Sequence, residues 1–397
     1  MIFNYLRKPT PSNLLGSPDA FRYYESAMFS MGWWTPQKYK ILYYIAAACI
    51  MTWSVVYLPI GISISFLKDI RNFSPSELLT VLQLFFNSVG LPFKVLFFNL
   101  SSWRFHKAKE LLGKLDKRCT RLEERIEVHR WVVHCNKAYL IYQLMYICYT
   151  ISTFLSAVAT GQPPWRIYNP FVDWRQSRQN FWIATIHETM LMLCTATQTL
   201  LSDIYPLLYG LMLRVHIKLL RQRVERLCTN PSKSEEKNQV DLINCIKDHK
   251  LIKEYTQMIR PVISRTIFIQ FLLIGICLGL SMINLLLLAA FWTGVATVAY
   301  INGLMLQTFP FCFVCDLIKA DCDHLEMAIF HSNWLNTSRR YKTSLIYFLQ
   351  NTQIPIAFIA GYIFPISTST NISVAKLAFT VVTFVNQLNI AERLKKD

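Results

Sequence analysis

Several ionisable side chains stand inside long apolar stretches of this sequence, where a charge is costly unless it meets a partner. His187 and Glu188 are neighbours in one stretch, Asp203 lies further along the same stretch, and Lys94 lies in another. The residues after Glu188 do not complete the His-Glu-x-x-His motif of zinc proteases. We expect His187 and Glu188 to make hydrogen bonds between helices, with proximity to a ligand pocket as the alternative. We also expect Lys94 and Asp203 to form an ion pair.

The cysteines and histidines offer no further chemistry. The eleven cysteines are scattered singly, which does not indicate a disulfide framework. Cys312 and Cys315 have redox-motif spacing, but they follow Pro310 in an apolar segment, so we expect them to be small buried hydrophobic residues. No glycine-rich phosphate loop or marked nucleophile is present, so we predict no catalytic residue, no metal and no cofactor. A membrane enzyme remains an alternative that no motif supports.

The elements that must position these groups are membrane-spanning helices. Charged residues make up 16% of the chain, whereas an average soluble protein has about 25%. The charges are missing from long segments and return in blocks between them, and a spanning helix needs roughly 20 mostly apolar residues. We therefore predict an all-α membrane protein with seven transmembrane helices, at about residues 41–66, 75–100, 138–160, 180–213, 263–292, 295–318 and 372–390.

The basic residues between the spans predict the orientation of the chain. Of the 41 Lys and Arg residues, 29 fall on the side of the N-terminus and 8 on the other side. Lys and Arg concentrate on the cytoplasmic side, so we expect a cytoplasmic N-terminus and an extracellular C-terminus. This orientation excludes a G-protein-coupled receptor. The net charge of +17 sits in loops beside apolar segments, which argues against nucleic acid as the partner. The sequon at Asn72 falls in an outer loop, so we expect glycosylation there.

The cytoplasmic blocks mix charged and apolar residues at helical spacing. We expect the inner ends of the spans to extend into a helical anchor, with a separate amphipathic helix over Tyr341–Gln353; plain solvated charged faces are the alternative. The predicted division is 1–40, a cytoplasmic segment; 41–318, six spans with cytoplasmic extensions; 319–371, the anchor region with its short helix; 372–390, the last span; and 391–397, an extracellular tail.

Three stretches of the C-terminal third carry a more specific pattern. They read AYINGLMLQTFPFC over 299–312, LEMAIFHSNW over 325–334 and AFTVVTFVNQL over 378–388. This pattern resembles the C-terminal signature of insect odorant receptors, and the length, the seven spans and the orientation fit the same family. Many members have Tyr-Ser where this chain has Phe379-Thr380. The chain lacks the long second cytoplasmic insertion of the shared co-receptor, so it resembles a ligand-tuned subunit.

The resemblance implies an odour-gated channel. In the family, four subunits surround one pore, the last helix of each lines it, and tuned subunits assemble with the co-receptor in the plasma membrane of olfactory neuron dendrites. A small volatile odorant opens the pore directly to cations, without a G protein. Phe384, Gln387 and Leu388 match the outer constriction and share one helical face, with Val381 one turn further in. Ordinary helix packing would also explain these residues.

The resemblance also implies an odour pocket in the outer half of the membrane, between the second, third, fourth and sixth spans. A volatile ligand needs an apolar and aromatic cavity with a few polar groups. Packing between helices is the alternative explanation for each candidate. The candidate pocket residues are Phe85, Phe86, Val89, Tyr149, Thr153, His187, Met192, Tyr300 and Leu304.

Two other classes of membrane protein remain as alternatives for this sequence. A gustatory receptor of the same superfamily would share the fold and a pore in the last span. Its closing motif resembles Thr-Tyr-x-x-x-x-x-Gln-Phe, whereas Gln387 is followed here by Leu388. A secondary transporter would tend to show internal repeats and broken helices, which we do not find.

Overall fold

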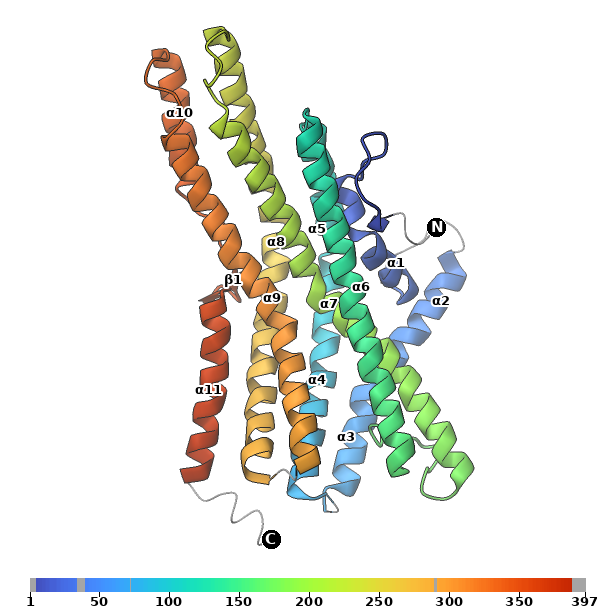
Figure 1. The fold of residues 1–397 in the computed structure, drawn as a ribbon. Helices are drawn as coiled ribbons and strands as arrows, with labels where there is room; N and C mark the ends of the chain where they lie inside the picture. Colours follow the sequence, from blue (N-terminus) through green and yellow to red (C-terminus); the bar gives the residue numbers. More distant parts are fainter. Residues whose placement is uncertain (1–4, 34–39, 72, 289–290, 388–397) are drawn as a thin grey trace.

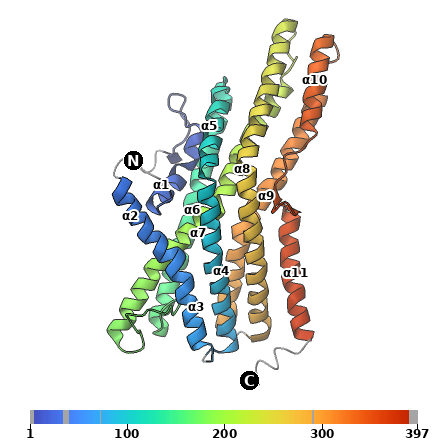
Figure 2. The same cartoon turned by 180° about the vertical axis from the view of Figure 1, so that it is seen from behind.

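The computed structural model describes residues 5–33, 40–71, 73–288 and 291–387, and these form an elongated bundle of long helices (Figures 1 and 2). The last helix ends near the C-terminus at one end of the bundle, and α10 stands at the opposite end. The first long helix is continuous over α2 (Lys40–Met51), the π-helical η3 (Thr52–Tyr57) and α3 (Leu58–Asp69). α8 (Glu235–Ile283) is likewise continued by the π-helical η4 (Asn284–Leu288). The other helices of the bundle are α4 (Pro75–Leu100), α5 (Ser102–Lys117), α6 (Leu122–Thr160), α7 (Arg178–Glu225), α9 (Phe291–Phe330), α10 (Arg339–Thr352) and α11 (Thr368–Gln387).

Each predicted span coincides with a helix, although several helices are longer than the apolar segment alone. Five of the described helical stretches are long and apolar enough to cross a membrane, beginning at Lys40, Pro75, Leu122, Glu235 and Gly294. The other two expected spans, α7 and α11, are not among these five and pack against members of this group. The expected short amphipathic helix is present as α10. The division of the chain into cytoplasmic and extracellular parts stays a prediction.

The ends of α6, α7, α8 and α9 nearest α10 continue beyond the apolar segments and pack together with α5. Buried ion pairs join them: Arg223 on α7 lies 2.8 Å from a Glu124 oxygen on α6 and 2.5 Å from an Asp248 oxygen on α8. The short N-terminal helices η2 (Ser17–Phe21) and α1 (Arg22–Ser30) pack on the same region. The charged blocks of the sequence therefore form a packed layer with buried ion pairs.

A small β-hairpin that was not expected from the sequence connects α10 to α11. Its strands are β1 (Ile359–Ala360) and β2 (Phe364–Pro365), which pair antiparallel. The turn needs positive φ at Gly361 (57°) and Tyr362 (60°), as mirror-image hairpin turns do. Gly361 N donates to Ser264 O of α8 at 3.0 Å, and a Cβ at Gly361 would come within 2.6 Å of the Phe268 ring. The hairpin therefore fixes the start of α11 against α8.

The expected ion pair between Lys94 and Asp203 is confirmed. Lys94 Nζ lies 2.7 Å from Asp203 Oδ1, and each side chain is only 5% exposed. The pair joins α4 to α7 in the interior of the bundle, where both charges are shielded from bulk solvent. Removing one partner of a buried pair costs more than replacing both, because it leaves a buried charge without a partner.

We predict that Lys94→Met lowers the free energy of unfolding by about 3–5 kcal/mol, because the Asp203 carboxylate is then buried alone. The double variant Lys94→Met/Asp203→Leu should recover most of this loss, because no charge remains. The melting temperature of the purified full-length protein measures both effects. A double variant as unstable as the sum of its single changes would contradict the pairing.

Candidate functional site

Tyr300 on α9 lies in a cluster of apolar side chains formed with α4 and α8. Its hydroxyl accepts a hydrogen bond from Asn87 Nδ2 on α4 at 2.6 Å. Leu304, one turn further along α9, is 3% exposed and belongs to the same cluster, as does Phe86. The expected residues Tyr300, Leu304 and Phe86 are thus brought together around the polar contact between Tyr300 and Asn87.

A second cluster adjoins the first and contains His187. Trp53 Nε1 of η3 donates to His187 Nε2 at 3.1 Å, so the expected hydrogen bond between helices is confirmed for this histidine. Phe85 packs in this cluster, and its ring centroid lies 5.6 Å from that of Phe86. Two aromatic neighbours on α4 therefore connect the two clusters.

Glu188, which is 2% exposed, fixes the segment between α6 and α7. Its two oxygens accept from the backbone N–H groups of Trp165 (2.7 Å), Arg166 (3.1 Å) and Ile167 (2.8 Å). Arg166 has a positive φ of 49°, which is uncommon for a side chain of this kind. Ser65 Oγ on α3 also donates to Arg166 O at 2.7 Å. Glu188 therefore holds the loop over the second cluster, where Ile167 is buried.

The remaining expected pocket residues differ in their surroundings. Met192 on α7 is 1% exposed, and Val89 on α4 is half-buried. Tyr149 on α6 is 52% exposed, so in this single chain its ring faces outward. Thr153 Oγ1 donates to the Tyr149 carbonyl of its own helix. The structure thus places Tyr149 and Thr153 at the rim of the clustered candidates.

Two buried amides that the sequence did not single out are further candidates. In the described part of the chain, Gln83 Nε2 and both polar atoms of Gln198 have no hydrogen-bond partner, and Gln198 is 0% exposed. An unpaired buried amide is costly, so such groups suggest a missing polar partner. Asn87 was also missed. A polar residue inside an apolar span is the signal that would have found all three.

α11 is attached to its own chain along one narrow stripe. Asn371 is 1% exposed and Ala378 3%, and Val374 packs beside them. Of the expected gate residues, Val381 is 43% exposed, Phe384 is 59% exposed and Gln387 is exposed. Leu388 lies outside the described residues, and so does Asn72.

Two hydrogen bonds tie the first turn of α11 to α9. Asp316 Oδ2 accepts from the backbone N–H of Thr368 at 2.9 Å, where a carboxylate favours a helix N-terminus. Asn371 Nδ2 donates to Thr308 Oγ1 at 3.1 Å, in a buried contact. Thr308 lies about two turns from Tyr300 on the same helix. α9 therefore contacts both the Tyr300 cluster and α11.

Ser17, Asp116 and His216 meet in the packed cytoplasmic layer, but not in a catalytic arrangement. Ser17 Oγ donates to Asp116 Oδ1 at 2.6 Å and lies 3.0 Å from His216 Nε2. Burial lowers the pKa of His216 to about 3, so the ring is neutral and its 3.7 Å approach to Asp116 is no ion pair. A catalytic triad needs histidine to take the serine proton, whereas here the carboxylate accepts it and Ser17 is 0% exposed.

The expected burial of Cys312 and Cys315 is confirmed, since they are 0% and 7% exposed. Within the described ranges, no group of three or more His, Cys, Asp or Glu side chains could hold a metal ion.

Comparison with known proteins gives consistent results. The family model described as "7tm Odorant receptor" matches residues 74–379. Odorant receptor 98a of Drosophila melanogaster is 70% identical and Odorant receptor 42b 46% identical, each over the full length of both chains. The structure of the insect olfactory receptor OR5 from Machilis hrabei has a TM-score of 0.75 at 15% identity, covering 93% of this chain and 98% of that one. The structure of that receptor in complex with eugenol has a TM-score of 0.72. The expected fold is thereby confirmed.

We predict that Tyr300→Phe shifts the half-maximal ligand concentration by about tenfold, because the half-buried Asn87 amide loses its acceptor at a cost of about 1–3 kcal/mol. The current without ligand should stay unchanged. Dose–response recordings measure both. Tyr347→Phe, at an exposed position on α10, is the matched control. An unchanged dose–response for Tyr300→Phe would contradict a role in binding.

Proposed function

The chain belongs to the odorant receptor family, and from this membership we propose that it is the ligand-binding subunit of a non-selective cation channel that a small volatile odorant opens directly. Family membership removes the gustatory receptor and the secondary transporter as alternatives. It also removes the membrane enzyme.

The observation that carries the proposal is the position of α9 between two sites. At one level it presents Tyr300 and Leu304 to the apolar clusters, which have the aromatic character and sparse polar groups that a volatile ligand requires. Thr308, about two turns beyond Tyr300, contacts α11, and Asp316, about two turns beyond Thr308, accepts from its first backbone N–H. A ligand that displaces the Tyr300 side of α9 acts on a helix that directly contacts the expected pore helix.

The exposed side of α11 supports its role in lining a pore. Within the described part of the chain, Val381, Phe384 and Gln387 are exposed. Apolar rings of this kind close a pore by excluding water, and a polar Gln beside them favours rehydration when the ring opens. Lys376 lies inward of them and is also exposed. We place the gate at Phe384, Gln387 and Leu388, with Val381 beneath it.

The partner and the cellular location follow from the proposed role. The exposed sides of α11 need neighbouring subunits, and we propose that the odorant co-receptor supplies them in a heterotetramer. The channel would reside in the plasma membrane of olfactory neuron dendrites, with Asn72 glycosylated on the outer side. The odorant would bind among Phe85, Phe86, Val89 and their partners on α6, α7 and α9, without any need for a G protein.

We predict that cells expressing this chain together with the co-receptor pass cation current during pulses of odorant, and that cells expressing the chain alone do not. Patch-clamp recording against an odorant panel measures this. A blocker of G-protein signalling in the pipette is the control and should leave the current intact. Loss of the response under that blocker would contradict direct gating.

We predict that Leu388→Ser raises the current without odorant several-fold and changes the half-maximal odorant concentration little. A polar side chain in the apolar constriction favours water, so the closed state is less complete. The ratio of basal to maximal current measures the effect. Ile372→Ser, at an exposed position on the opposite face of α11, is the matched control. An equal ratio of basal to maximal current in both variants would place the gate elsewhere.

A further inference from the structure

Five polar side chains, one from each of five helices, form an almost closed ring inside the bundle. Lys94 Nζ of α4 donates to Asp203 Oδ1 of α7 at 2.7 Å and to Gln270 Oε1 of α8. Gln270 Nε2 donates to Gln307 Oε1 of α9 at 2.7 Å. Gln307 Nε2 in turn donates to the Tyr146 hydroxyl of α6 at 3.2 Å. A link between Tyr146 and Asp203 would complete the ring.

Three of the hydrogen bonds run in one direction, from Lys94 through Gln270 and Gln307 to Tyr146, and Lys94 also donates to Asp203 on its other side. An ammonium group only donates and a carboxylate only accepts, so the ring must start at Lys94 and end at Asp203. Each amide between them accepts with its oxygen and donates with its nitrogen. Tyr146, the last member, accepts from Gln307, which leaves its own proton to donate. At the other side of the gap, Asp203 Oδ2 is buried and has no hydrogen-bond partner in the described part of the chain.

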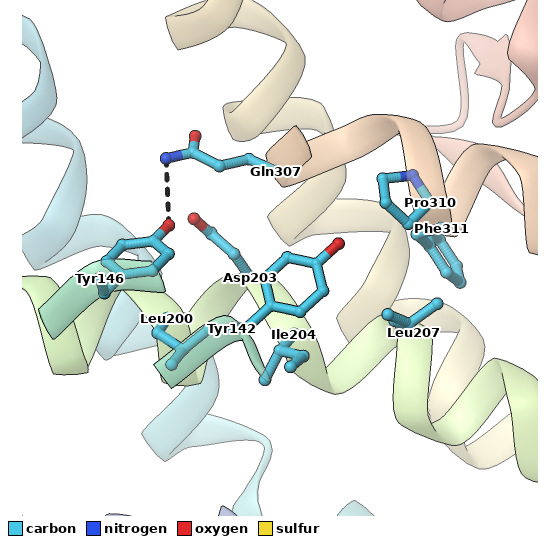
Figure 3. Close-up of a pocket in the computed structure, with 9 residues that line it drawn as sticks. All are labelled: Tyr142, Tyr146, Leu200, Asp203, Ile204, Leu207, Gln307, Pro310 and Phe311. Carbon is cyan, nitrogen blue, oxygen red and sulfur yellow. Dashed lines mark hydrogen bonds between the residues drawn. The ribbon is translucent and has the colours of Figure 1, made fainter. Parts of the chain in front are cut away.

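A cavity lies at this gap. Its volume is about 10 Å³, and its polar lining comes from Tyr142, Tyr146, Asp203 and Gln307. In Figure 3 the Asp203 carboxylate and the Tyr146 hydroxyl point into the same space. A cavity of roughly 10–15 Å³ with two to four polar partners is what one buried water molecule requires.

We propose that one structural water molecule occupies this cavity, accepts a hydrogen bond from the Tyr146 hydroxyl and donates one to Asp203 Oδ2. Its second proton reaches the oxygen of Tyr142, whose own proton is donated to Leu306 O at 3.2 Å. The water closes the ring and satisfies the one carboxylate oxygen that the protein leaves unpaired. The five helices α4, α6, α7, α8 and α9 are then joined in one hydrogen-bonded circuit.

Other occupants fit the cavity less well. An odorant is far larger than 10 Å³, so this site is separate from the candidate odour pocket. A metal cation would meet the field of the Lys94 ammonium, which already neutralises Asp203 at 2.7 Å. An empty cavity is expected only where the lining is apolar, whereas this lining carries a carboxylate and two phenols.

A cryo-electron microscopy map of the full-length protein in its assembled state tests the proposal directly. In a map that resolves ordered water elsewhere in the bundle, we expect a peak within hydrogen-bond distance of both Tyr146 Oη and Asp203 Oδ2. An empty cavity in such a map overturns the proposal. A direct hydrogen bond between the two side chains overturns it as well.

Substitutions at the gap provide a second measurement. Tyr146→Phe removes the donor to the water and should lower the melting temperature of the purified protein by about 2–4 °C. In an Asp203→Asn background this decrease should shrink by at least half, because the acceptor of the same water has changed. Tyr139→Phe removes a hydroxyl on the same helix that donates to Gln143 and lies outside the cavity, so it is the control: its effect should be alike in both backgrounds. Equal Tyr146→Phe effects in both backgrounds overturn the proposal, and where Asp203→Asn does not fold, the map decides.

Discussion

The structure depends on one constraint: a polar group in the apolar interior must find a partner inside the bundle, because neither bulk water nor a lipid headgroup reaches it. Lys94 and Asp203 neutralise each other, Glu188 accepts three backbone N–H groups, and His187 accepts from Trp53. Each solution joins segments that are distant in the sequence. The costly groups are therefore also the ones that fix how the spans sit against one another.

This constraint explains which features the sequence predicted well. Apolar length located all the spans, and the cost of isolated charge was enough to pair Lys94 with Asp203 before any coordinates were known. Hydrogen-bond partners that are neutral were harder to predict from the sequence. Asn87, Gln270 and Gln307 carry no charge, and their contacts depend on the rotation of each helix, which hydropathy does not determine. The hairpin before α11 was missed because two short strands pair through turn geometry at Gly361 and not through an apolar pattern.

The candidate site was likewise predicted only in part from the sequence. The family signature located Tyr300 and the α11 face, and the structure brings Tyr300, Leu304 and Phe86 into one cluster. Periodicity could not show that Tyr149 turns outward while Met192 is fully enclosed. Nor could it show that α9 contacts both the cluster and α11, since that follows from the crossing of helices in three dimensions. The sequence thus predicts which residues form the site, whereas the packing of the helices determines how they are arranged.

The narrow attachment of α11 has a consequence for signalling. A helix held by one buried stripe, a short hairpin and two hydrogen bonds to α9 costs little to displace, so its closed and open positions differ by only a small free energy. Each 1.4 kcal/mol of differential binding changes the ratio of the two positions about tenfold. A small odorant with few contacts can then tip the balance. In the proposed channel, the same small gap means that some channels open with no odorant present, so the sensitivity to odorant and the basal current are set by one quantity.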